Sequence, residues 1–158
     1  METHKRWSRL QKSLYQLTDE SIDFQLHLSV YRMQSSRGST VLPRYWITLD
    51  GEIIFDYPKD RMVKDENGIS LVGNLDGGTM YYPYCSEISD ISCFIREYID
   101  TPAKELLRKH FDSDNWGLAN VLKAADRRIG RRRLGELRKR TGNKAAHKII
   151  ARRLAGGN

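Results

Sequence analysis

Cysteine is scarce in this sequence of 158 residues, which has only Cys85 and Cys93. The two lack the CxxC spacing of a zinc or redox motif, and no histidine stands next to either. They therefore indicate neither a metal site nor a disulfide framework. We expect both thiols to be reduced.

Long apolar runs are also missing. No segment approaches the length of a membrane span, and the first ten residues, METHKRWSRL, lack the apolar stretch of a secretory signal. We therefore expect a cytoplasmic protein that has no membrane partner.

Catalytic signatures are absent from the sequence as well. The four histidines stand in different segments, and none belongs to an HExxH, GxSxG or Cys-His arrangement. His27 lies on the polar side of an alternating segment, where a solvated histidine is expected more often than a site. Asp56 fits a hydrogen-bonded structural carboxylate better than a buried one with a raised pKa. We expect a non-enzymatic protein with no cofactor and no metal.

Acidic residues are rare only at the carboxyl end. Thirteen Lys and Arg but two acids lie from Val121 onward, whereas the first 120 residues hold fourteen bases and eighteen acids. A chain of this length can bury one core without disulfides or metals, so we expect a single domain over residues 1–158. Within it, residues 1–85 combine a helix with a sheet, and residues 86–158 are helical and basic.

The strongest local signal is a hairpin. Two runs of β-branched and aromatic residues, 44–49 and 52–58, are joined at Asp50-Gly51, a dipeptide suited to a type I′ turn. The simple register places Ile47 opposite Ile54 and Trp46 opposite Phe55. Neither face is then plainly polar, so we expect helices or a partner chain to cover the second face.

The segments around this hairpin differ in period. Helical spacing predicts an amphipathic helix over 5–17, and alternation predicts a strand over 22–33. Residues 34–43 are rich in Gly, Ser and Pro and predict an exposed loop, since the spacing of a phosphate-binding loop is missing. Residues 59–84 are typical of either a second short hairpin or an exposed insertion.

Helical spacing dominates the rest of the chain. Helices are predicted after Ser86, after a Thr101 cap followed by Pro102, near 116–129, and in two basic segments, 131–140 and 143–154. The sequence thus predicts an α+β domain. It combines an antiparallel sheet of three to five strands with an N-terminal helix and a C-terminal group of about five helices.

Three stretches carry a family resemblance: SVYRMQSSRGSTVLPRYWITLDGEIIFDYP, SEISDISCFIREYIDTP and NVLKAADRRIGRRRL. They resemble a family of small uncharacterised bacterial proteins of the integron mobile-gene-cassette type. The resemblance spans most of the chain, although residues 61–82 look like an insertion. It implies a bacterial cytoplasmic accessory protein and names no activity and no catalytic residue.

The basic section predicts a partner. Clustered Lys and Arg bind DNA, RNA or another polyanion by displacing counterions, and three consecutive short helices permit a helix-turn-helix-like arrangement. The alternative is a solvated basic face that pairs partly with the acidic body. The candidate nucleic-acid contacts are Arg127, Arg128, Arg131, Arg132, Arg133, Lys144, Lys148 and Arg152.

A second hypothesis is a protein-partner module, either immunity-like or one subunit of a homodimer. It depends on aromatic residues of the kind found at interface hot spots. The alternative is that these side chains fill the protein's own core. The candidate partner contacts are Tyr45, Trp46, Tyr57, Tyr81, Tyr82 and Tyr84.

Overall fold

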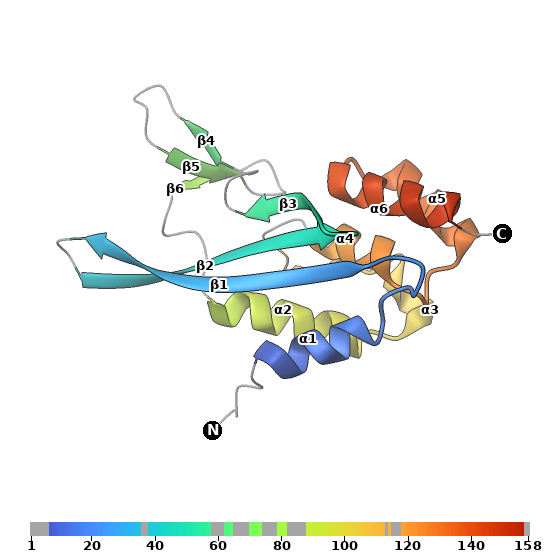
Figure 1. Ribbon diagram of the computed structural model, residues 1–158, viewed down its shortest axis with the longest axis horizontal. Coiled ribbons are helices and arrows are strands. Elements are labelled where there is room, and N and C mark those ends of the chain that lie inside the picture. Colours follow the sequence, from blue (N-terminus) through green and yellow to red (C-terminus); the bar gives the residue numbers. More distant parts are fainter. Residues whose placement is uncertain are drawn as a thin grey trace.

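The computed structural model describes residues 7–35, 38–57, 62–64, 70–73, 79–81, 88–112, 114 and 118–156. A helix precedes six strands, and five helices follow them (Figure 1). The elements are α1 (Trp7–Tyr15), β1 (Phe24–Ser35), β2 (Gly38–Leu49), β3 (Glu52–Tyr57), β4 (Met62–Lys64), β5 (Ser70–Gly73), β6 (Thr79–Tyr81), α2 (Ile88–Asp100), α3 (Ala103–Leu106), α4 (Leu118–Ala125), α5 (Arg131–Arg140) and α6 (Lys144–Ala155). The predicted α+β class, with an N-terminal helix, an antiparallel sheet and about five C-terminal helices, is confirmed.

The main sheet has the antiparallel order β1-β2-β3. Its alternating residues bury one face, on which Leu26 pairs with Ile47 and Phe24 with Leu49. Helices α1 and α2 lie together on one side of this sheet (Figure 1). The predicted strand over 22–33 and the predicted amphipathic helix are therefore confirmed, because Leu10 and Leu14 of α1 are buried in the same core.

The hairpin forms at the predicted turn, since Asp50 and Gly51 have φ angles of 51° and 85°. The predicted register is wrong for both Ile47 and Trp46, because an irregularity between Ile47 and Thr48 shifts the pairing. Ile47 lies opposite Phe55, and Trp46 lies opposite Asp56. A β-bulge adds one residue to a strand and so moves the following side chains to the other face.

The shifted register has a packing consequence. Phe55 moves to the buried face, where its ring stacks on Tyr45 with 6.0 Å between centroids. The opposite face keeps Trp46 and Thr48 half-buried and leaves Ile53 exposed. Within the described residues, no helix fully buries that face, and its coverage by a partner stays a prediction.

The predicted loop over 34–43 is also wrong. Strand β1 continues to Ser35 and β2 begins at Gly38, with Pro43 paired opposite Val30. Residues 36 and 37, within this segment, lie outside the described residues. Backbone pairing between two long neighbouring strands outweighs the local turn composition here.

Residues 59–84 contain a second antiparallel sheet of order β4-β5-β6. Met62 pairs with Val72, and Val72 pairs with Met80. The short-hairpin alternative was therefore closer to the structure, which adds a third strand to it.

Helix α1 also protects the sheet edge formed by β1. The Tyr15 hydroxyl donates to the Leu26 carbonyl oxygen and accepts from the Leu26 amide, both at 3.1 Å. Gln11 Nε2 donates to the same carbonyl oxygen at 2.7 Å. Because an edge strand leaves backbone groups unpaired, these side chains replace a neighbouring strand at that position.

The connections between the C-terminal helices correct two details of the prediction. Thr101 does not cap α3; its hydroxyl donates back to the Glu97 carbonyl oxygen at 2.8 Å, and Pro102 is the N-cap residue. Helix α4 ends at Ala125, before Ile129. Among the described residues, no helix is long and apolar enough to cross a membrane.

Candidate functional site

Helix α5 carries most of its cations on its exposed side. Leu134 and Leu137 are buried and anchor the helix, whereas Arg132 and Lys139 point away from them and are exposed. Residues seven apart fall on nearly the same side of a helix. The basic residues of α5 therefore form three such pairs, which are Arg131 with Arg138, Arg132 with Lys139, and Arg133 with Arg140.

Helix α6 follows after a three-residue connection. The Asn143 side chain accepts from the Ala146 amide at 3.1 Å and caps its first turn. Ala146, Ile149 and other apolar residues bury one side of α6. Lys144 and Lys148, one turn apart, are exposed.

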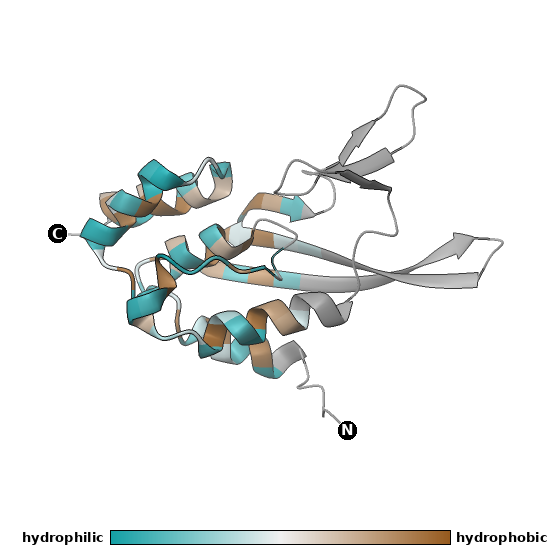
Figure 2. Cartoon of the chain, turned by 180° about the vertical axis from the view of Figure 1, so that it is seen from behind, coloured by the Kyte–Doolittle hydropathy of each residue, from teal (hydrophilic) through white to brown (hydrophobic). Residues whose placement is uncertain are grey.

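Helix α6 lies between β3 and α5, so α5 is the outer helix of the pair (Figure 1). The two helices also meet at their far ends, where Arg131 Nη2 donates to the Leu154 carbonyl oxygen at 3.1 Å. Figure 2 shows hydrophilic and apolar colouring alternating along both helices, as expected of helices that each bury one side. Exposed cations therefore continue from the end of α5, at Arg140, across the three-residue connection into the start of α6, at Lys144.

We call this region the basic surface. Its members are exposed cations of α5 and of the first turns of α6. They are Arg131, Arg132, Arg138, Lys139, Arg140, Lys144 and Lys148.

Four of the eight candidate contacts belong to the basic surface: Arg131, Arg132, Lys144 and Lys148. Arg132 is 92% exposed, and its Nε lies 3.9 Å from Glu136 Oε1, which is a weak pair on one turn of helix.

The other four candidates lie outside it. Arg127 is exposed on the turn after α4, and Arg133 donates to the Ala103 carbonyl oxygen. Arg152 pairs with Asp50 at the hairpin turn at 2.8 Å. Arg128 is held inside by Asp126.

Sequence reasoning missed three members of the basic surface: Arg138, Lys139 and Arg140. The signal that could have found them is their spacing of seven from Arg131, Arg132 and Arg133. Within the described residues, none of the three has a carboxylate within ion-pair distance.

A buried polar cluster surrounds Asp126. Its carboxylate accepts from the Tyr98 hydroxyl at 2.8 Å and from Arg128 Nη2 at 2.8 Å, while Arg128 Nη1 donates to the Thr101 carbonyl oxygen. Burial, reinforced by the Asp126 charge, raises the pKa of Tyr98 well above 10.0. The hydrogen bond that Arg128 donates to the Asp126 carboxylate raises the pKa of Arg128.

This cluster is closed to substrates. The gap beside Asp126, lined also by Leu14, Phe24 and Leu122, is too small to hold a water molecule. A titratable side chain with a perturbed pKa in an open cleft would suggest catalysis. The Asp126 carboxylate is instead buried and hydrogen-bonded, which fits a structural role.

The aromatic candidates separate into two groups. Tyr45 is fully buried, whereas Trp46 is half-buried on the opposite face and stacks on His27 with 5.0 Å between centroids. His27 Nε2 also lies 3.0 Å from the Thr48 hydroxyl oxygen. Tyr57 and Tyr81 belong to strands, but their side chains, like residues Tyr82 and Tyr84, lie outside the described residues.

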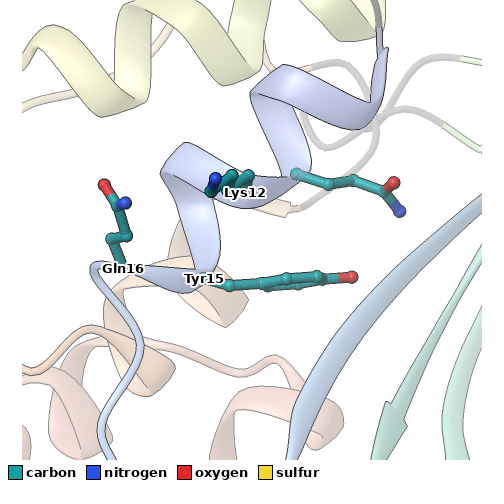
Figure 3. A pocket seen from close by; sticks show the side chains of 4 residues that line it. Lys12, Tyr15 and Gln16 are labelled. Carbon is teal, nitrogen blue, oxygen red and sulfur yellow. The ribbon is translucent and has the colours of Figure 1, made fainter.

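An open hollow of about 440 Å³ lies beside α1 (Figure 3). It is lined by Gln11, Lys12, Tyr15 and Gln16. The polar ends of Gln11 and Tyr15 already bond to the Leu26 backbone, so the hollow offers few converging groups to a ligand.

Metal-ligating residues do not converge in the portion of the chain that the structure describes, where no three His, Cys, Asp or Glu side chains gather as a metal site requires. Cys93 is exposed on α2.

These observations define an α+β protein with a three-stranded antiparallel sheet and a basic pair of C-terminal helices. Residues 6–154 match the model of the SF0329 protein family, and the chain belongs to that family. The predicted resemblance is confirmed to this extent, while the integron-cassette type stays a prediction. No curated protein and no solved structure matches the chain.

Proposed function

We propose that this protein binds a polyanion, with nucleic acid as the main partner, through the basic surface of α5 and α6. The observation that carries the proposal is the placement of cations on both flanks and the outward side of α5. A solvated helix usually alternates both signs of charge, but Glu136 is the sole acid of α5.

Geometry supports a contact with several phosphates at once. The paired cations of α5 repeat after seven residues, which is about 10.5 Å along the helix axis. Lys144 and Lys148 extend the basic surface beyond the Thr141 turn. Contacts of this kind position a nucleic-acid backbone without reading bases, so we expect binding with little sequence preference.

A salt series tests the proposal. Affinity for duplex DNA and for single-stranded RNA should fall as salt rises, with a slope of about −0.9 per phosphate neutralised on duplex DNA. No binding to either polymer at about 10 μM protein in roughly 50 mM salt would refute it, because even non-specific binders reach that range.

A charge-matched pair of variants tests the location. Arg132→Gln with Lys139→Gln should weaken binding about tenfold and reduce the salt slope by about two. Arg9→Gln with Lys12→Gln removes the same charge from exposed positions of α1. Equal losses in the two double variants would mean that net charge, and not the basic surface, governs binding.

A second candidate is supported by the half-open face of the main sheet. Ile53 is 54% exposed there, near Trp46 and Thr48. This face could take a protein partner or a second copy of the chain. Light scattering should then detect a dimer that Ile53→Asp dissociates, whereas a monomer at high micromolar concentration would exclude the homodimer.

A further inference from the structure

Gly135 has no packing reason to be glycine. It lies in the middle of α5, where glycine costs roughly 1 kcal/mol relative to alanine. A Cβ atom added there would have no neighbour within 4 Å among the described residues. Its φ angle is not positive either, since Gly51 is the positive-φ glycine of the described chain.

The side chains that neighbour Gly135 one turn before and one turn after it are cationic. Side chains three and four positions away are the surface neighbours of a helical residue. For Gly135 these are Arg131, Arg132, Arg138 and Lys139, all of which are exposed. Gly135, which is half-buried and has open space where a Cβ would lie, is thus flanked by four positive side chains.

We propose that Gly135 lets a phosphate group of a bound nucleic acid lie directly against the α5 backbone, between these four side chains. This inference rests on the proposed function and names its point of closest approach. Glycine is used where a ligand must come close to the backbone, because it has no side chain to hold the ligand away. Coulomb energy rises as the separation falls, so the close approach strengthens each of the four charge contacts.

The charges themselves support a phosphate at this point. Glu136, the acid of α5, is next in sequence and therefore turned about 100° away from Gly135 around the helix. Arg132 pairs with this carboxylate only weakly, because their closest nitrogen and oxygen atoms are 3.9 Å apart and the Arg132 side chain is 92% exposed. Arg131 is exposed and keeps its positive charge while its Nη2 donates to the Leu154 carbonyl oxygen, so it still adds to the positive potential around Gly135.

The test uses two substitutions that keep the charge constant. Gly135→Ala should raise the unfolding midpoint, because alanine favours the helix, and yet weaken binding to duplex DNA or single-stranded RNA by about fivefold. Gly135→Leu should weaken binding further, since the larger side chain keeps the phosphate more distant. Opposite signs for stability and affinity would not arise from damage to the fold.

Gly142→Ala is the matched control. Gly142 is exposed in the turn between α5 and α6, and an added Cβ would also meet open space there. The Gly142→Ala variant should bind duplex DNA and single-stranded RNA with the affinity of the unchanged protein.

The outcomes separate the two proposals. If the unchanged protein binds nucleic acid and both Gly135 variants bind equally well, the close approach at Gly135 is refuted while the basic surface stands. If the unchanged protein binds neither polymer, the proposed function fails and this inference fails with it. Inorganic phosphate should displace the bound DNA or RNA much less effectively than unlabelled polymer does at the same phosphate concentration. Equal displacement would overturn the assignment to a nucleic acid.

Discussion

Arg153 Nη2 donates to Asp19 Oδ2 at 2.8 Å, although 134 positions separate the two residues. Arg153 is itself buried, and its guanidinium also donates to the carbonyl oxygens of Ala124, Asp126 and Ile129. The last carbonyls of a helix lack partners within that helix, so Arg153 satisfies groups that α4 and the turn after it leave unpaired. Arg153 thereby holds α6 against α4 and the turn that follows it, and α5 packs against α6.

Replacing Arg153 should destabilise the whole fold. Arg153→Met should lower the free energy of unfolding by about 3 kcal/mol, because three buried carbonyl groups and the Asp19 carboxylate lose a donor. Denaturant unfolding measures the loss. The neighbouring Arg152→Met is the control, since its ion pair with Asp50 is exposed and contributes little. Equal losses would contradict this role of Arg153.

Acid should weaken the same connection. Burial opposes the charge of Asp19, but hydrogen bonds from Ser21 and the charge of Arg153 outweigh it, so the pKa of Asp19 lies below its ordinary 3.8. A carboxyl group with a lowered pKa in the folded state stabilises the fold above its unfolded pKa. That contribution is lost as the pH falls through the folded pKa.

Unfolding curves recorded from neutral pH down through 3.8 can test this for Asp19→Asn. The variant should be less stable than the unchanged protein at neutral pH, and the difference should shrink as the pH falls. A difference that stays constant with pH would show that the Asp19 charge does not contribute.

Tyr98 should be needed for its hydroxyl and not only for its ring. Tyr98→Phe removes a donor from the buried Asp126 carboxylate and should cost about 1.5–3 kcal/mol, as for a hydrogen bond to a charged group. Because the pKa of Tyr98 is raised well above 10.0 by burial, phenolate absorbance should lack one tyrosine until the protein unfolds in alkali. In Tyr98→Phe, this late step should be absent.

Gly51 should tolerate no side chain at the hairpin turn. Its φ of 85° lies in a region that L-residues avoid, so Gly51→Ala should lower stability by about 1–2 kcal/mol. No atom of the described residues lies within 4 Å of the added Cβ, so the expected cost comes from the backbone conformation. Gly142→Ala, where the added Cβ also has open space among the described residues but φ is not positive, should be close to neutral.

Local patterns were reliable where one side of an element is buried. The helix predicted over 131–140 matches α5, and the helix predicted over 143–154 lies within one residue of α6. In α6 the apolar residues Ala146, Ile149 and Ile150 are buried as their spacing indicates. Burial of an amphipathic stripe is a strong requirement, so it can be recognised in the sequence.

Patterns failed where pairing between distant residues decided the outcome. The bulge that places Phe55 beside Tyr45 depends on how two strands fit a shared core, and no local signal marks it. The composition of residues 34–43 is typical of a loop, yet β1 and β2 pair through most of that segment. The eight candidate cations were likewise chosen by type, which does not reveal that Arg128 is held by Asp126.

The sequence by itself determined the α+β class, the Asp50-Gly51 turn and the basic, amphipathic character of the last two helices. Each of these depends on residue type and spacing within a short segment. Only the tertiary structure decided which cations stay exposed on α5 and which pair inside, as Arg153 does with Asp19. Charge acts through distance and burial, and the three-dimensional packing of segments far apart in the chain sets both.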